Sequence, residues 1–474
     1  MMTSPSPRSL ETLTMTINQQ ALHITDTMKV MKFGGTSVGS AQRMKDVSAL
    51  ITSDGQAKIV VLSAMSGTTN TLVEIADYLY KKNPEGAHDV INRLELKYME
   101  HIHELYATDE WREKTEKFLR EEFSYLRSFS KSLFTSFEEK VILAQGEIIS
   151  TNMVTNYLLE QGVNAVLLSA LDMIRTDKNA EPDLNYIREK TQAQLEANPG
   201  YEIYITQGFI CRNAYGEIDN LQRGGSDYTA CLIGAAIEAE EIQIWTDIDG
   251  MHNNDPRIVE GTEPVRQLYF EEAAELAYFG AKILHPTCIQ PAKFSGVPVR
   301  LLNTMDPTAP GTIINNHMHR GTIKAVAAKD NIICIGIQSS RMLLAHGFLR
   351  KVFEIFESYK TSIDMIATSE VGVSVTIDSH AHLKPIVDEL KKYGTVTVDE
   401  NMCIVCVVGD LSSQNVGFET LATDALKHIP IRMISYGGSA HNISFVVAQD
   451  DKKRTLQALQ QMLFKYDGHV RRQN

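Results

Sequence analysis

The stretch MKVMKFGGTSVGSAQRM, Met28 to Met44, joins a short apolar run to a glycine-rich turn and a helical pattern. The turn consists of Gly34, Gly35, Thr36 and Ser37, and we expect a helix to start near Ser37. Glycines let backbone N–H groups approach phosphate oxygens, and a helix N-terminus adds the positive end of a dipole. Lys32, which ends the apolar run, adds a full positive charge. Because a P-loop carries its lysine after the last glycine, this pattern indicates either a phosphate site of another kind or a structural turn of the common strand–Gly-Gly–helix type.

The composition is typical of a soluble globular protein. The 474 residues are 43% hydrophobic and 22% charged, and the length indicates two or three domains. The formal net charge of −13 argues against non-specific binding to nucleic acids or anionic membranes. No apolar run reaches the ~20 residues that cross a bilayer. We therefore predict a cytoplasmic protein with neither a nucleic-acid nor a membrane partner.

Of the six cysteines, only Cys403 and Cys406 form a C-x-x-C, and they lie in an apolar strand pattern. Residues three apart on a strand point to opposite faces. We therefore expect a reduced, packed pair in a reducing compartment rather than a metal or redox site.

Residues 28–305 alternate short apolar runs with helical stretches. The runs KIVVLSAM, NAVLLSAL, EIYITQGFI and EIQIWTDIDG lack the polar alternation of half-exposed strands and end in Gly, Ser or Asp. Such runs suit a sheet covered on both faces, and ligands then bind beyond the carboxyl ends of the strands. The pattern over residues 75–140 predicts helices that leave this sheet. The predicted fold class of this domain is therefore an α/β sandwich.

The pattern changes after residues 306–322, the predicted linker. A strand–helix–strand–strand–helix–strand order follows over residues 323–400, and the order recurs over residues 401–474. We predict two ferredoxin-like βαββαβ units in tandem. Residues 1–27 are polar and lack the apolar core of a signal peptide, so we expect a disordered tail or a segment outside the native protein.

A second glycine turn, RGGSDYTA, spans Arg223 to Ala230 and precedes an apolar helical pattern. It equally suits a capped helix start with Asp227 in the first turn. Two Gly-Gly turns with hydroxyl residues in one α/β domain favour a shared phosphate cradle. WTDIDGMHNNDPR, residues 245–257, predicts either tight turns or a loop against a nucleotide base and ribose.

The sequence shows no nucleophile–base pair and no set of metal ligands. It instead contains glycine turns, lysines, acidic residues and one arginine, which are typical of enzymes that transfer phosphoryl groups. That chemistry depends mainly on positioning and charge neutralisation. A carboxylate acceptor is already ionised at pH 7 and needs no general base. Lysines and Mg²⁺ would offset its repulsion from the triphosphate.

Taken in order, KFGGTSV, VVLSAMSGTTN, QGEIIS, QRGGSDYTA, WTDIDGMHNNDPR, ELAYFGAKILHP and GTII resemble the motifs of aspartokinases in the amino-acid kinase family. The resemblance runs from Met31 to near the C-terminus. It implies a catalytic domain over residues 28–305 that transfers the γ-phosphoryl group of Mg-ATP to the β-carboxylate of L-aspartate. The product would be 4-phospho-L-aspartate, in the first step of lysine, threonine and methionine biosynthesis. In this family the lysine leaves the first strand beside the glycines, which accounts for Lys32.

The resemblance also assigns roles by position. Lys32 would bind the phosphates, Lys282 would assist at the nucleotide, and Asp227 would hold these lysines in place. Arg223 would bind the α-carboxylate of aspartate, and Glu147 its ammonium group. The other expected contacts are, for phosphate, Gly34, Gly35, Thr36, Ser37, Gly224 and Gly225; for aspartate, Ser63, Thr69 and Ser226; and for the nucleotide, Thr246, Asp247, His252 and Arg257. His252 stands where many relatives have tyrosine.

The tandem units resemble ACT domains, which in this family bind an amino-acid effector and build the dimer. The resemblance implies a homodimer through these units, or a tetramer, and feedback regulation with lysine favoured over threonine. The expected effector pocket consists of Met342, Gly347, Phe348, Leu349, Asp364, Ser369 and Glu370. Ala345 stands where a serine is common. The pattern at residues 346–349 equally suits a helix start with core residues.

Two other classes of function compete with this interpretation. Acetylglutamate, glutamate and uridylate kinases lack tandem ACT units, and Arg223 with Glu147 suits a free α-amino acid. A non-catalytic amino-acid sensor is disfavoured by the intact Lys32, Asp227 and Lys282. The length leaves no room for a homoserine dehydrogenase half, so we expect a monofunctional enzyme.

Overall fold

The computed structural model describes residues 28–131, 133–221, 224–280, 284–339, 346–412 and 414–464. These residues form two compact units, one of residues 28–250 and 287–316 and one of residues 251–286 and 317–464. The segment 251–286, which we predicted as part of the catalytic domain, packs within the second unit. The tail predicted over residues 1–27 lies outside the described residues. Within them, no helix is long and apolar enough to span a membrane.

The first unit is built on a sheet with the strand order β3-β4-β2-β1-β7-β9-β10. Its strands are β1 (Lys29–Phe33), β2 (Lys58–Leu62), β3 (Ala165–Leu168), β4 (Ile203–Gln207), β7 (Glu241–Thr246), β9 (Val299–Asn303) and β10 (Thr312–Asn315). All neighbouring pairs are parallel except β9 and β10. β2 and β4 are buried along their whole length, as the unalternated apolar runs predicted. The predicted α/β class is confirmed.

Alternate residues of the central strands face different layers of helices. Met31, Phe33, Val60 and Leu62 share an apolar core with α2 (Ala41–Thr52) and α6 (Ser136–Glu160). α9 (Gly225–Ala236) contacts β1, β2 and β7. Lys32 alternates with Met31 and Phe33, so its side chain leaves the core that these two residues share with α2 and α6.

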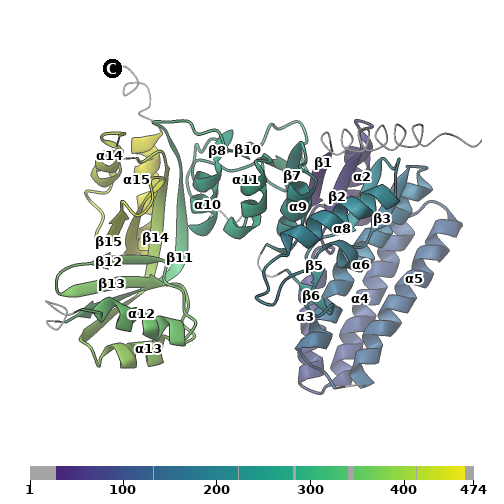
Figure 1. Ribbon diagram of the computed structural model, residues 1–474, viewed down its shortest axis with the longest axis horizontal. Helices are drawn as coiled ribbons and strands as arrows, with labels where there is room; N and C mark the ends of the chain where they lie inside the picture. Colours follow the sequence, from purple (N-terminus) through teal and green to yellow (C-terminus); the bar gives the residue numbers. More distant parts are fainter. Residues whose placement is uncertain are drawn as a thin grey trace, which may run out of the picture. The chain divides into compact units, whose positions relative to one another are not determined.

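The predicted helical excursion is confirmed and lies beside the sheet (Figure 1). It consists of α3 (Thr68–Tyr80), α4 (Pro84–Leu105), α5 (Asp109–Ser128), a 3-10 turn (Phe129–Lys131) and α6. The helices pack through fully buried side chains such as Tyr98, Ile102, Leu119 and Phe123. The remaining elements of this unit are α7 (Ala170–Met173), α8 (Leu184–Ala197), α11 (Gln290–Ser295) and the hairpin of β5 (Ile210–Arg212) and β6 (Ile218–Asn220).

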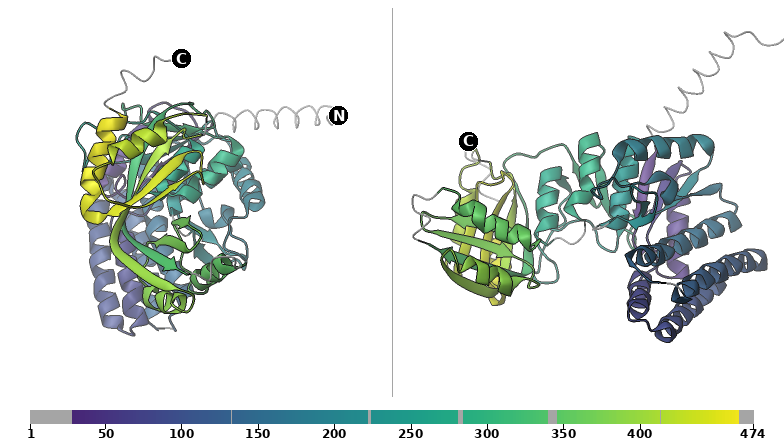
Figure 2. Two further views of the ribbon diagram at one scale, coloured as in Figure 1. Left: turned by 90° about the vertical axis from the view of Figure 1, so that its left-hand side faces the viewer. Right: turned by 60° about the horizontal axis from the view of Figure 1, so that its bottom comes forward.

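The second unit contains a six-stranded antiparallel sheet in the order β12-β13-β11-β14-β16-β15, with helices packed against it (Figure 2). Its strands are β11 (Ile323–Gln338), β12 (Met365–Thr368), β13 (Gly372–Ile377), β14 (Thr395–Gly409), β15 (Ile431–Tyr436) and β16 (Asn442–Ala448). The helices of its C-terminal part are α12 (Phe348–Ser358), α13 (Leu383–Leu390), α14 (Phe418–Ala425) and α15 (Lys452–Leu463). The segment 251–286 of this unit contributes β8 (Gln267–Tyr269) and α10 (Phe270–Tyr278).

Two long strands run through both predicted βαββαβ units. The later half of β11 pairs with the early half of β14 and with β13, whereas residues 323–329 pair with residues 404–409. Asn331 and Asn401, with φ of 59° and 56°, lie where the halves meet. Separate apolar cores lie around Ile335 and around Val405. The start of β11 therefore completes the part of the sheet that belongs to the second βαββαβ unit. The sequence order had assigned the whole of this strand to the first βαββαβ unit.

The cysteines of the C-x-x-C motif are buried free thiols on β14. Cys403 belongs to the apolar core with α14 and α15. Burial raises the pKa of the Cys403 thiol to about 12. A buried thiol of raised pKa is unreactive. The packing of both cysteines in the interior, expected from the sequence, is confirmed.

Candidate active site

The first glycine turn places a charged pair at the end of β1. Lys32 Nζ lies 2.7 Å from Asp227 Oδ1, and the two side chains are 11% and 15% exposed. Asp227 stands in the first turn of α9, which begins after Gly224 in the left-handed conformation, φ 80°. The structure therefore brings together the lysine of one predicted phosphate turn and the acid of the other.

The turn itself needs glycine because two strand ends approach closely. A Cβ atom on Gly35 would lie 2.7 Å from the carbonyl oxygen of Ala64, and Gly35 O accepts a hydrogen bond from Ser66 N–H at 3.1 Å. The expected helix start near Ser37 is one turn too early, because α2 begins at Ala41 with Ser40 as its N-cap. The helix dipole therefore lies farther from Gly34 than the sequence suggested.

Glu147, on α6, is a buried carboxylate at the end of β2. Its Oε1 accepts a hydrogen bond from Ala64 N–H at 3.1 Å, and its Oε2 has no hydrogen-bond partner among the described residues. Only 3% of the residue is exposed, and this burial raises its pKa to about 7. A buried unpartnered carboxylate oxygen is costly unless a ligand supplies a donor. The geometry suits a ligand ammonium group.

A cavity of about 350 Å³ opens beside Glu147, and we call it the Glu147 cavity. Six predicted residues line it: Gly35, Ser63, Thr69, Glu147, Gly225 and Ser226. Ser63 Oγ donates to Ser226 Oγ at 2.9 Å, which ties the ends of β2 and α9 together. Ser150, one turn after Glu147 on α6, donates to the carbonyl of Ser63 at 2.8 Å. These contacts fix the walls of the cavity relative to α6.

The sequence reasoning missed other residues of this cavity: Ala64, Met65, Ser66, Gly67, Asn70 and Phe209. Phe209 adopts φ 69°, which is unusual for a non-glycine residue. Its N–H donates to Thr229 Oγ1 at 3.0 Å, and a Cβ on Gly225 would lie 2.7 Å from its ring. Its place just after β4, at a carboxyl strand end, is the signal that could have found it.

The predicted nucleotide residues divide between the two units. Thr246 ends β7, and Asp247 follows it on the exposed surface of the first unit. His252 and Arg257 belong to the second unit, where His252 Nδ1 lies 3.2 Å from Thr262 Oγ1 and Arg257 forms an ion pair with Asp255 at 2.8 Å. Arg223, Lys282 and Met342 lie outside the described residues. The roles of all these residues stay predictions.

Three of the predicted effector residues stand at the ends of β12, and three others stand at the start of α12. Asp364 precedes the strand, and Ser369 and Glu370 follow it. Gly347, φ 83°, caps α12, and Phe348 packs in the core, as the alternative interpretation expects, while Leu349 is 37% exposed. A cavity of about 360 Å³ is lined by Ser369 with Thr397 and Arg432 among others, but its lining does not include Asp364.

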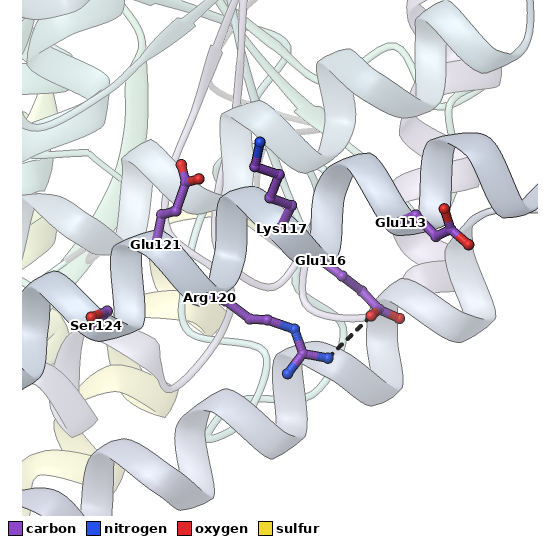
Figure 3. Close-up of a pocket in the computed structure, with 6 residues that line it drawn as sticks. All are labelled: Glu113, Glu116, Lys117, Arg120, Glu121 and Ser124. Carbon is purple, nitrogen blue, oxygen red and sulfur yellow. Dashed lines mark hydrogen bonds and ion pairs between the residues drawn. The ribbon is translucent and has the colours of Figure 1, made fainter.

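A larger depression, of about 530 Å³, lies along α5 (Figure 3). Its lining residues all come from this helix: Glu113, Glu116, Lys117, Arg120, Glu121 and Ser124. Arg120 and Glu116 form an exposed ion pair at 3.2 Å, one helical turn apart. Charged side chains one turn apart on an exposed helix are typical of a solvated surface, so this depression does not compete with the Glu147 cavity.

Comparisons with known proteins cover most of the chain. The amino acid kinase family model matches residues 27–303, and an ACT domain model matches residues 405–463. The chain is 33% identical over 448 residues to the lysine-sensitive aspartokinase 3 of Escherichia coli (strain K12), covering 92% of this chain and 99% of that protein. It is 34% identical over 465 residues to the chloroplastic aspartokinase 3 of Arabidopsis thaliana, covering 92% and 82%.

Two solved structures share the fold over most of the chain. E. coli aspartokinase III in complex with aspartate and ADP, in its R-state, superposes with a TM-score of 0.80 at 33% identity, covering 92% of this chain and all of that one. The same enzyme in complex with lysine and aspartate, in its T-state, gives 0.78 at 34% identity, covering 92% and 99%.

Proposed function

The chain belongs to the amino acid kinase family, as an aspartokinase, and from this premise we propose the reaction, the residue roles and the regulation. The proposed reaction passes the γ-phosphoryl group of Mg-ATP to the β-carboxylate of L-aspartate and gives 4-phospho-L-aspartate. Mg²⁺ enters with ATP as part of the substrate. The observation that carries the proposal is the Glu147 cavity next to the pair of Lys32 and Asp227.

In this proposal Glu147 binds the ammonium group of aspartate. Its buried Oε2 has no protein donor in the described part of the chain, and an ammonium group would supply one. Ser63, Thr69 and Ser226 offer hydroxyl groups to the rest of the substrate. Arg223 would bind the α-carboxylate, as the family resemblance implies.

Lys32 neutralises charge on the transferring phosphoryl group. Asp227 fixes the direction of the Lys32 side chain through their 2.7 Å ion pair. The acceptor carboxylate is ionised at neutral pH, so the residues need to position it and reduce repulsion rather than remove a proton. Gly35 lets the backbone approach without a side chain in the way.

The second unit is proposed to bind an amino-acid effector, with lysine favoured over threonine, and to form the homodimer. The support is the likeness to a lysine-sensitive relative at 33% identity and to a structure that contains lysine. The effector would act by its differential affinity for active and inactive states.

The test is aspartate-dependent ADP release with Mg-ATP, with and without millimolar lysine or threonine. Turnover with aspartate, but not with glutamate or acetylglutamate, and suppression by lysine are the expected results. Suppression by threonine alone would retain the kinase and overturn the effector assignment. No turnover from folded protein that still binds an amino acid would favour a sensor.

A further inference from the structure

One loop supplies most of the wall of the Glu147 cavity. It runs from Ser63 to Asn70, between the end of β2 and the first turn of α3, and we call it the 63–70 loop. All of its residues except Thr68 line the cavity. Thr68 is 1% exposed and contacts the helices behind the loop instead. The position of this loop therefore decides how the cavity receives its ligand.

The first half of the 63–70 loop is held by elements of the site itself. Ala64 N–H donates to Glu147 Oε1 at 3.1 Å, and Ser66 N–H donates to the carbonyl of Gly35 at 3.1 Å. A Cβ atom on Gly146 would lie 2.7 Å from the Cβ atom of Ala64, so α6 passes directly against the loop. A shift of the loop would therefore disturb both α6 and the first glycine turn.

The second half of the loop is held by α4, a helix that contributes no residue to the lining of the cavity. The hydroxyl groups of Thr68 and Tyr98 lie 2.9 Å apart, and among the described residues neither has another partner. The residue before Tyr98, Lys97, donates from Nζ to the carbonyl of Ser66 at 3.3 Å. α4 packs against α3, which Thr68 begins (Figure 1). Two consecutive residues of α4 thus contact the loop.

The bond between Thr68 and Tyr98 lies in an apolar environment. Tyr98 is fully buried and belongs to the core that the helices share with the sheet. Burial, with a smaller contribution from the charge of Glu147, raises the pKa of Tyr98, so its hydroxyl keeps its proton. A buried hydroxyl that loses its partner is costly. The bond therefore fixes Thr68 on α4, one residue before Thr69 lines the cavity.

We propose that Tyr98 is a positioning residue for the amino-acid substrate, because through Thr68 it holds the 63–70 loop in the conformation that receives aspartate. The inference rests on the proposed function, which takes the Glu147 cavity as the aspartate site. The family resemblance assigned no role to Thr68 or Tyr98. The inference gives α4 a function in substrate binding, whereas the sequence predicted it only as part of a helical excursion.

The expected effect is a loss of affinity for aspartate. When the loop is held less firmly, a smaller fraction of molecules has a cavity ready for the substrate, and the apparent affinity falls by that fraction. A neutral hydrogen bond is worth about 2- to 12-fold in an equilibrium constant. Tyr98→Phe should therefore raise the Kd and the KM for L-aspartate about fivefold. Its kcat should stay within about twofold of the parental value, because bound substrate restores the loop.

The experiment compares the full-length parent, Tyr98→Phe and Tyr106→Phe by calorimetric titration with L-aspartate and by aspartate-dependent ADP release. Tyr106 is the matched control, since it is also buried, directly follows α4 and donates to the carbonyl of Met153 at 2.7 Å. Met153 does not line the cavity. Tyr106→Phe should lose stability and keep the parental Kd and KM for aspartate.

A double variant, Thr68→Val with Tyr98→Phe, separates positioning from folding. It leaves no unpaired hydroxyl at this place, so its urea midpoint should return toward that of the parent. Its Kd for aspartate should stay raised, because the bond that positions the loop is still absent. A purely structural role of the pair would restore both quantities together.

Three outcomes overturn the positioning role. They are a Kd of Tyr98→Phe within about twofold of the parental value, an equal rise of Kd in Tyr106→Phe, and a double variant that recovers both its midpoint and its Kd. All three leave the proposed kinase reaction in place. A folded parent that neither binds nor turns over aspartate overturns the proposed function and this inference with it.

Discussion

The two predicted ligand sites each contain a buried carboxylate, and they differ in what neutralises it. Among the described residues, Glu147 accepts one backbone hydrogen bond and forms no ion pair. Asp364 is paired with Lys329 and bonded by Tyr278. The charge of Glu147 therefore has no cationic partner in the described part of the chain, whereas the charge of Asp364 is already paired with a lysine.

The largest expected effect lies at the first site and tests whether its cation serves catalysis. Lys32→Met should lower kcat by roughly 10³-fold, because a preorganised charge on the transferring group is lost. Steady-state ADP release measures this change. The control is Lys58→Met on the neighbouring strand, since Lys58 is even more buried, 1% exposed against 9% for Lys32, but pairs with Asp54. A similar loss of kcat in both variants would assign the effect of Lys32 to folding instead.

The next effect tests whether Lys329 is the structural counter-ion of Asp364. Burial alone would lower the pKa of Lys329, but Asp364 and Asp378 raise it above the ordinary value. Lys329→Met should lower the free energy of unfolding by about 3 kcal/mol, because a buried carboxylate loses its cation. Denaturant titration measures this loss.

A matched control for Lys329 is Lys427→Met, which breaks an exposed pair with Asp424. Its loss should stay below about 1 kcal/mol. If Lys329→Met and Lys427→Met both lower the free energy of unfolding by less than about 1 kcal/mol, Lys329 is not a structural counter-ion of Asp364.

The smallest effect is a pH dependence of stability at Glu147. Because its folded pKa is about 7, raised by burial from 4.5, the folded protein binds more protons than the unfolded chain between these values. The free energy of unfolding of the parent therefore falls as the pH rises through this window. Glu147→Gln has no carboxylate to ionise, so its free energy of unfolding does not fall in this way. The difference in free energy of unfolding between the variant and the parent should therefore grow in favour of the variant by about 2 kcal/mol from pH 5 to pH 8. Urea titrations of both proteins at the two pH values measure the gain, and a constant difference would contradict it.

Much of the fold followed from local pattern. The unalternated runs that became β2 and β4 and the helices of residues 75–140 were all predictable from hydrophobic periodicity. The site was predictable in part, because loops after parallel strands meet at one edge. That rule suits Ser63 at the end of β2, whereas Glu147 on α6 and Ser226 on α9 came from the family resemblance. Neither named Phe209, whose role depends on the packing of its ring on Gly225. The start of α2 was wrong by one turn because Ser40, not Ser37, provides the cap.

The sequence by itself determined the α/β fold class and the family. Glycine spacing, apolar strand runs and motif order can be read from the sequence without knowing any tertiary contact. Only the tertiary structure decided that residues 323–329 pair with the strand of the second βαββαβ unit, because strand pairing depends on partners distant in the chain. It also decided that residues 251–286 pack in the same compact unit. The tertiary structure likewise decided which groups surround each of the two buried carboxylates. A carboxylate's pairing and pKa depend on which side chains folding brings within about 3 Å, and no spacing in the sequence reports that distance.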